Sequence, residues 1–166
     1  MFPVPARFAV PGFGLAAGAC ALVLAGVGSA QSATTLTFKE LTKGSTFVFV
    51  DNAPASKTKG EPAASAGDVI VFTNPLVDAT GKRIGRLYIH CTAVVAARLA
   101  AKAPYACEGV VVLGGGTLSI QAFLAHAGAT VHGAVTGGTG TYANARGTLL
   151  SKPTKAGADD TITLAA

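Results

Sequence analysis

Residues 136–147 read TGGTGTYANARG, a glycine-rich stretch that either cradles a phosphate or turns the chain between two strands. A phosphate-binding P-loop has the pattern GxxxxGK[ST] between a strand and a helix, and here no lysine follows the glycines. The dinucleotide pattern GxGxxG is also absent, because Gly138 and Gly140 have the required spacing but position 143 is alanine. A strand pattern resumes at Tyr142, so the stretch predicts a tight turn between two β-strands.

The sequence on both sides of this turn has the short, alternating apolar runs that are typical of β-strands. No segment has the spacing and caps of an amphipathic helix, and residues 52–66, rich in Pro, Ala and Ser, predict a long mobile loop. The pattern predicts an all-β domain, and both a sandwich and an up-and-down barrel satisfy it. The predicted strands cover residues 34–41, 45–51, 67–74, 84–97, 105–113, 117–125, 130–136, 142–150 and 160–164.

The first 30 residues have the order of segments found in a secretory signal peptide. Arg7 is followed by a long apolar run, and Gly28 and Ala30 supply the small residues before a cut after Ala30. Cleavage leaves residues 31–166 as one secreted or periplasmic domain with no membrane attachment. Two alternatives stay open, namely a membrane anchor over residues 8–30 and a lipoprotein modified at Cys20.

Charge and motifs exclude several classes of function. The 13 basic and 8 acidic residues are scattered, whereas a nucleic-acid-binding surface needs a basic stripe with interleaved aromatics. No GxSxG nucleophile elbow is present, and Asp159 and Asp160 are interpreted as a turn. No metal or other cofactor is predicted, because three histidines lack ligand spacing and neighbouring Cys or carboxylate partners: His90, His126 and His132.

Two cysteines, Cys91 and Cys107, remain in the chain after cleavage of the leader. An even number of cysteines in an exported protein predicts a disulfide. Two buried free thiols are the alternative.

Polar residues interrupt two of the predicted strands. Pro75 cannot continue a ladder, so the strand at 67–74 is expected to end at Asn74, which places this amide at a barrel rim. If alternation holds across 142–150, Tyr142, Asn144 and Arg146 share one face. That face either lines a cavity or meets solvent, and both interpretations stay open.

The two runs resemble the allene oxide cyclase barrel and dirigent protein superfamily. The run VFTNPLVDATGKRIGR at 71–86 is similar to a dirigent segment, and GGTGTYANARG at 137–147 nearly reproduces the later dirigent motif GGTGxFxxARG. The matches keep their order and cover nearly all of 45–150. Residues similar to plant allene oxide cyclases are Gly67, Asp68, Phe72, Asn74, Leu76, 83–85, Cys91 and the run LSIQA at 118–122.

The resemblance implies an eight-stranded antiparallel up-and-down β-barrel with a small central cavity, needing no cofactor and assembled as a dimer or trimer. It also implies an isomerase-like or cyclase-like activity that directs the stereoselective cyclisation or isomerisation of a small lipophilic or phenolic molecule. A non-catalytic exported ligand-binding or structural barrel is the alternative. Two or more ionisable groups that converge on the inner face would favour the enzyme.

The resemblance also implies candidate site residues. Asn74 and Arg146 match family positions near the ligand, with Asp51 as the nearby acid and with Tyr142 and Phe72 as ligand-binding walls. The sequence lacks the acidic residues of the family. The cyclase glutamate has no counterpart, because Asp51 lies one residue further along the strand, and the two dirigent acids are replaced by Asn74 and Thr141. Cys91 matches a pocket cysteine, which a bond to Cys107 would remove from chemistry.

Overall fold

The computed structural model describes residues 33–53, 55, 60 and 62–166, in which nine β-strands and two short 3-10 helices are found. The leader expected at 1–30 lies outside these residues, as does part of the loop expected at 52–66. No helix in the described part of the chain is long and apolar enough to cross a membrane.

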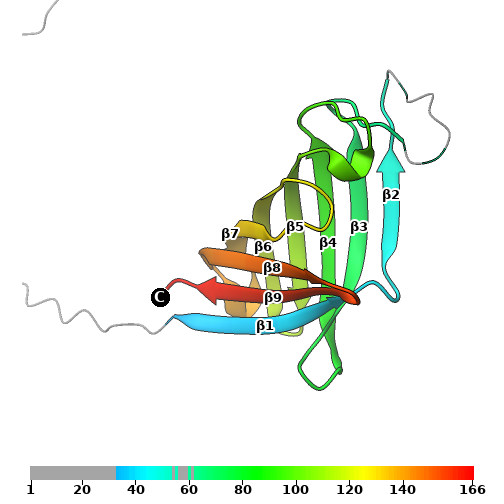
Figure 1. The fold of residues 1–166 in the computed structure, drawn as a ribbon. Coiled ribbons are helices and arrows are strands. Elements are labelled where there is room, and N and C mark those ends of the chain that lie inside the picture. Colours follow the sequence, from blue (N-terminus) through cyan, green and yellow to red (C-terminus); the bar gives the residue numbers. More distant parts are fainter. Residues whose placement is uncertain (1–32, 54, 56–59, 61) are drawn as a thin grey trace, which may run out of the picture.

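The strands form one antiparallel sheet that closes into a barrel (Figure 1). Their sheet order is β1-β9-β8-β7-β6-β5-β4-β3-β2, and β1 also pairs with β3, which closes a ring of eight strands and leaves β2 outside it. The all-β class and the eight-stranded barrel are therefore confirmed. The strands are β1 (Thr34–Leu41), β2 (Thr46–Val50), β3 (Val69–Val77), β4 (Arg83–Ala93), β5 (Tyr105–Leu113), β6 (Gly116–Leu124), β7 (Val131–Gly138), β8 (Gly147–Thr154) and β9 (Gly157–Leu164).

Strand β3 changes its partner along its length. It pairs with β2 up to Thr73 and with β1 from Leu76 onward. Pro75 lies between these two partners, where no strand opposes it on that side, so its missing N–H is tolerated. The predicted end of this strand at Asn74 is wrong, because the strand continues through Pro75 to Val77.

The glycine-rich stretch closes one end of the barrel. It connects β7 to β8 through a 3-10 turn, η2 (Gly140–Tyr142), and Asn144 adopts a positive φ of 62°. A Cβ at Gly138 would overlap the carbonyl oxygen of Tyr142, so this position requires glycine. The predicted connection is confirmed, but the following strand begins at Gly147 rather than Tyr142 because the turn occupies the residues between.

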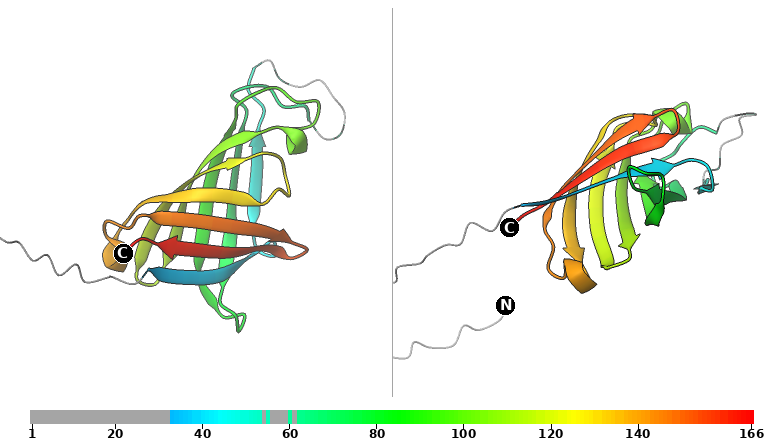
Figure 2. Two further views of the ribbon diagram at one scale, coloured as in Figure 1. Left: turned by 60° about the vertical axis from the view of Figure 1, so that its left-hand side comes forward. Right: turned by 90° about the horizontal axis from the view of Figure 1, so that it is seen from below.

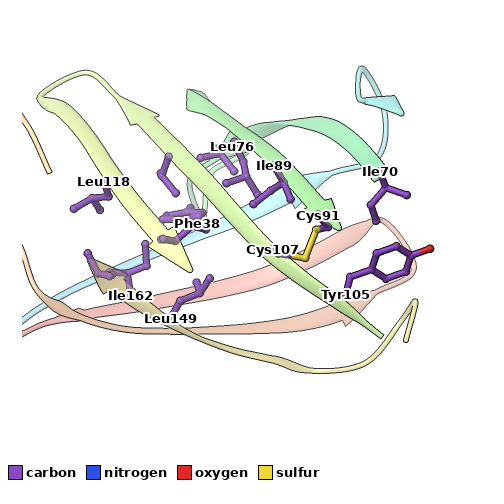
Figure 3. Close-up of a cluster of buried hydrophobic side chains, with 14 of the residues drawn as sticks. Phe38, Ile70, Leu76, Ile89, Cys91, Tyr105, Cys107, Leu118, Leu149 and Ile162 are labelled. Atoms are coloured by element: carbon purple, nitrogen blue, oxygen red, sulfur yellow. A yellow bond between two sulfur atoms is a disulfide. The ribbon is translucent and has the colours of Figure 1, made fainter. Parts of the chain in front are cut away.

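The barrel interior is packed at this closed end. Leu76, Leu118 and Ile162 are fully buried and come from the halves of their strands nearest the η2 turn. Figure 3 shows these side chains, with Phe38 and Leu149, pointing into one shared space. Both views in Figure 2 show β1, β9 and β8 side by side, with the C-terminus beside the start of β1.

The opposite end carries the longer connections. The β4–β5 connection contains the other 3-10 helix, η1 (Ala100–Lys102). The strand predicted at 84–97 therefore ends earlier, at Ala93. Asp68, which has no exposed surface, fixes the chain before β3. Its carboxylate accepts hydrogen bonds from the backbone N–H groups of Asn52 and Ser65 and from the Ser65 hydroxyl, at 2.7–3.0 Å.

Candidate functional site

The barrel interior is hollow at the end with the long connections. An inner chamber of about 140 Å³ is lined by inward-facing residues of the ring strands. A vestibule of about 200 Å³ lies beside it, and Leu124 lines both spaces. The vestibule is lined by Phe47, Phe49, Pro62, Ile70, Ala100, Ala101, Tyr105, Leu124 and Ala127. Together the two volumes fall at the lower end of the roughly 300–1,000 Å³ typical of small-molecule pockets.

Four polar side chains occupy neighbouring strands on one side of the interior. Going around the barrel they are Ser151 on β8, Asp160 on β9, Glu40 on β1 and Asn74 on β3. Ser151 pairs directly with Asp160, while Glu40 pairs with Ala158 and so lies diagonally to Asp160. Glu40 and Ser151 line the inner chamber, whose other lining residues are apolar. We call these four residues the polar arc.

Asn74 and Glu40 are joined across β3 and β1. The Asn74 Nδ2 donates a hydrogen bond to Glu40 Oε2 at 2.5 Å. Both side chains are half-buried, so the carboxyl group has a fixed orientation and still reaches the chamber. Asn74 therefore lies inside the barrel, midway along β3, and not at the strand end expected from the sequence.

Asp160 is the most deeply buried member of the polar arc, with 3% of its surface exposed. The pKa of its carboxyl is raised from the ordinary 3.8 to about 8, chiefly by burial and further by the charge of Glu40 and hydrogen bonding with it. Hydrogen bonding with Ser151 acts in the opposite direction. Among the described residues, Asp160 Oδ1 has no hydrogen-bond partner. The interior thus holds a carboxyl pair that retains a proton near neutral pH.

A disulfide forms part of the chamber wall. Cys91 on β4 and Cys107 on β5 are directly paired, face the interior and are bonded with an S–S distance of 2.03 Å. The structure therefore favours the predicted disulfide over two free thiols. Cys107 lines the inner chamber as half of this bond, so neither sulfur is a free nucleophile there.

The structure brings some of the predicted site residues together and separates others. Phe72 lines the inner chamber beside Glu40, close to Asn74 on the same strand. Tyr142 packs against the core at the closed end, and Arg146 is exposed, with its Nη1 donating to the carbonyl of Ala145. The expectation that Tyr142, Asn144 and Arg146 share a strand face is wrong, because all three precede β8.

Asp51 lies outside the interior site. It follows β2, is half-buried and is not among the residues that line either chamber. It does not join Asn74 in the polar arc.

Sequence reasoning missed the two acids of the interior. Glu40 lies in TTLTFKEL, where alternation places it on the same face as Leu36 and Phe38. Asp160, interpreted as part of a turn, lies inside β9 on the face of Ile162 and Leu164. Strict application of the two-residue period to both strands would have found both side chains.

A wider depression of about 680 Å³ lies on the outer face of the barrel over β4–β7. His90, Glu108 and His132 line it and are exposed to solvent, with His90 directly opposite Glu108 across β4 and β5. Within the described residues, no three His, Cys, Asp or Glu side chains could hold a metal ion together. The buried, coupled acids lie in the interior, which we therefore take as the candidate site.

A model of the allene oxide cyclase barrel like domain matches residues 48–161, well over half of the chain. The chain belongs to this family. Comparison with curated proteins gives no match.

Solved structures share this allene oxide cyclase-like fold. A pyocyanin demethylase has a TM-score of 0.63 and 23% identity, covering 80% of this chain and all of its own. A nonspecific heme-binding cyclase that catalyses a cycloaddition in neoabyssomicin biosynthesis has a TM-score of 0.51 and 17% identity, covering 81% and 63%. A Diels–Alderase from Streptomyces koyangensis has a TM-score of 0.54 and 13% identity, covering 83% and 71%.

Within the allene oxide cyclase-like barrel, the acids of this chain enter from β1 and β9. Of these, Glu40 precedes the span that matches the family model, and Asp160 lies at its end. The family match therefore does not include Glu40 and does not identify the pair. The ring closure between β1 and β3 is what carries Glu40 to Asn74.

Proposed function

We propose that this chain is an allene oxide cyclase-like barrel that binds a small lipophilic or aromatic molecule in its interior and directs a proton-coupled cyclisation or isomerisation there. The leader expected at 1–30 would export it from the cytoplasm. The observation that carries the proposal is the carboxyl pair, Glu40 and Asp160, at a chamber whose lining is apolar apart from Glu40 and Ser151. Convergent ionisable groups favour chemistry over simple carriage.

Glu40 has the contacts of a general base. Its carboxyl group lines the chamber and is held by Asn74, so it can accept a proton from a ligand and return it at another atom. Such a rearrangement has no net redox change and needs no co-reactant. Asp160 lies behind Glu40 as a positioning residue, and its retained proton supports the base through hydrogen bonding.

The apolar walls supply the second requirement. Phe72, Leu87 and Ile89 line the inner chamber together with Glu40 and exclude water from a bound ring. A chamber of about 140 Å³ is comparable to the ~150 Å³ engineered cavity that binds benzene. The three solved structures named above carry out small-molecule chemistry according to their names, which is consistent with this use of the fold.

The test uses a neutral aromatic substrate that requires only a positioned carboxylate base. We expect the protein to catalyse ring opening of 5-nitrobenzisoxazole, and Glu40→Gln to lower kcat/KM by about 100-fold, the usual contribution of a general base. Glu108→Gln on the outer face is the matched control and should retain the rate. Equal rates for the wild type and Glu40→Gln would show that Glu40 is not a base.

A further inference from the structure

The charge inside the barrel has a single sign. Glu40 is the charged residue that lines the inner chamber, and Asp160 lies directly behind it. No lysine, arginine or histidine is among the described residues that line the two chambers. Strand alternation directs the neighbouring cations outward, because Lys39 precedes Glu40 and Lys152 follows Ser151, and both are exposed.

The hydrogen-bonding groups of the polar arc are also unbalanced. One hydrogen of the Asn74 amide group is already donated to Glu40 inside the protein. Asp160 Oδ1 is buried without a partner in the described structure. A buried acceptor without a partner favours a ligand that brings a donor to it.

From these observations we infer that the interior selects ligands that present a protonated amine or amidine to Glu40 and rejects carboxylates of the same shape. This inference rests on the proposed function and specifies its ligand class. An ammonium group next to Glu40 gains a charge-assisted hydrogen bond, whereas a carboxylate would meet like charge in a space poor in water. Neutral ligands with a hydroxyl donor fall between the two.

Chamber sizes define the shape of such a ligand. The inner chamber accommodates one six-membered ring, with the cationic group directed at Glu40. The vestibule beyond Leu124 offers a further 200 Å³, approximately, lined by Phe47, Phe49 and other apolar groups. An arylalkyl amine, whose protonated nitrogen is attached through a carbon to the ring, with a short apolar extension therefore matches both spaces.

Three probes of nearly equal shape test the inference: benzylamine, benzyl alcohol and benzoate. Binding of each to the full protein is measured by calorimetry near pH 7, where the amine is a cation and the acid an anion. We expect benzylamine to bind at least about ten-fold more tightly than benzoate, with benzyl alcohol in between. The same ranking should persist in the outer-face control Glu108→Gln.

Glu40→Gln separates charge selection from ring binding. We expect this variant to lose the preference for benzylamine while it binds benzyl alcohol as the wild type does. If benzyl alcohol binds but benzoate binds as tightly as benzylamine, charge selection is wrong and the ligand-binding proposal stands. If none of the three binds, both are wrong. Should Glu40→Gln fail to fold, the wild-type ranking alone decides.

Discussion

Glu40 and Asp160 lie diagonally across the β1–β9 ladder, because Glu40 is paired with Ala158 and Asp160 with Phe38. This offset places two carboxyl groups within one another's influence inside a barrel. Their proximity raises the pKa of Asp160, although burial is the larger cause. The relationship leads to a stability prediction as well as a chemical one.

Stability should fall as pH rises from about 4 to 8. The folded state holds the Asp160 proton with a pKa of about 8, whereas the unfolded chain releases it near the ordinary 3.8, so unfolding releases a proton in this window. The loss approaches 1.4 kcal/mol per pH unit, roughly, as an upper limit. Urea unfolding of the wild type and Asp160→Asn at pH values across this window measures it.

The Asp160→Asn variant should give the flatter curve of stability against pH, because it has no proton to lose. Asp159→Asn is the matched control, since Asp159 is exposed on the same strand and only adds a smaller charge effect to Asp160. Parallel curves for Asp160→Asn and the wild type would contradict a raised pKa at this position.

Asn74→Asp should destabilise the barrel by about 2 kcal/mol above pH 5, because it replaces a donor to Glu40 with a third carboxyl group. Chemical denaturation at neutral pH checks the size of the effect. Asn144→Asp is the control, because this exposed turn residue with a positive φ tolerates aspartate and should change stability by less than about 0.5 kcal/mol. If the two substitutions changed stability equally, the hydrogen bond from Asn74 to Glu40 would not contribute to stability.

Replacing both Cys91 and Cys107 by alanine should lower the free energy of unfolding by about 3 kcal/mol, the chain-entropy value for a loop of about 15 residues. The two cysteines are 16 residues apart in sequence. Wild type treated with dithiothreitol under denaturing conditions should then unfold at the same urea concentration as the double variant. A wild-type transition that does not respond to the reductant would instead indicate free thiols.

Leu124→Trp should block passage between the vestibule and the inner chamber. Leu124 lines both spaces, so a larger side chain there fills the contact region. We expect calorimetry to show affinity for benzyl alcohol lowered by about ten-fold or more, with the fold retained. Phe123→Trp, on the exposed neighbouring position, should bind benzyl alcohol as the wild type does.

The strands could be predicted from the sequence where alternation is regular and the flanking residues are strong turn formers. Strands β1 and β5 have the bounds that the pattern predicts, 34–41 and 105–113. The end of β3 could not be predicted, because tolerance of Pro75 depends on a change of partner between β2 and β1. Pairing between strands far apart in sequence leaves no local signal.

The same limit applies to the candidate site. Asn74 and Phe72 were found because they lie in a recognisable run, and both face the interior. Glu40 and Asp160 lie in separate strands about 120 residues apart, and only the pairing of β1 with β9 makes them neighbours. The sequence places Arg146 in a strand, because the η2 turn before it has no recognisable helical pattern and the start of β8 at Gly147 is not marked.

The edge of β3 that pairs with both β1 and β2 gives these two strands different roles. Strand β1 completes the ring, whereas β2 adds Phe47 and Phe49 to the vestibule and is not needed for closure. Substitutions in β2 can therefore reshape the ligand entrance while the eight-stranded ring keeps its hydrogen bonds. Because β2 lines the ligand entrance and lies outside the closed ring, it is the natural place to begin redesign of ligand preference.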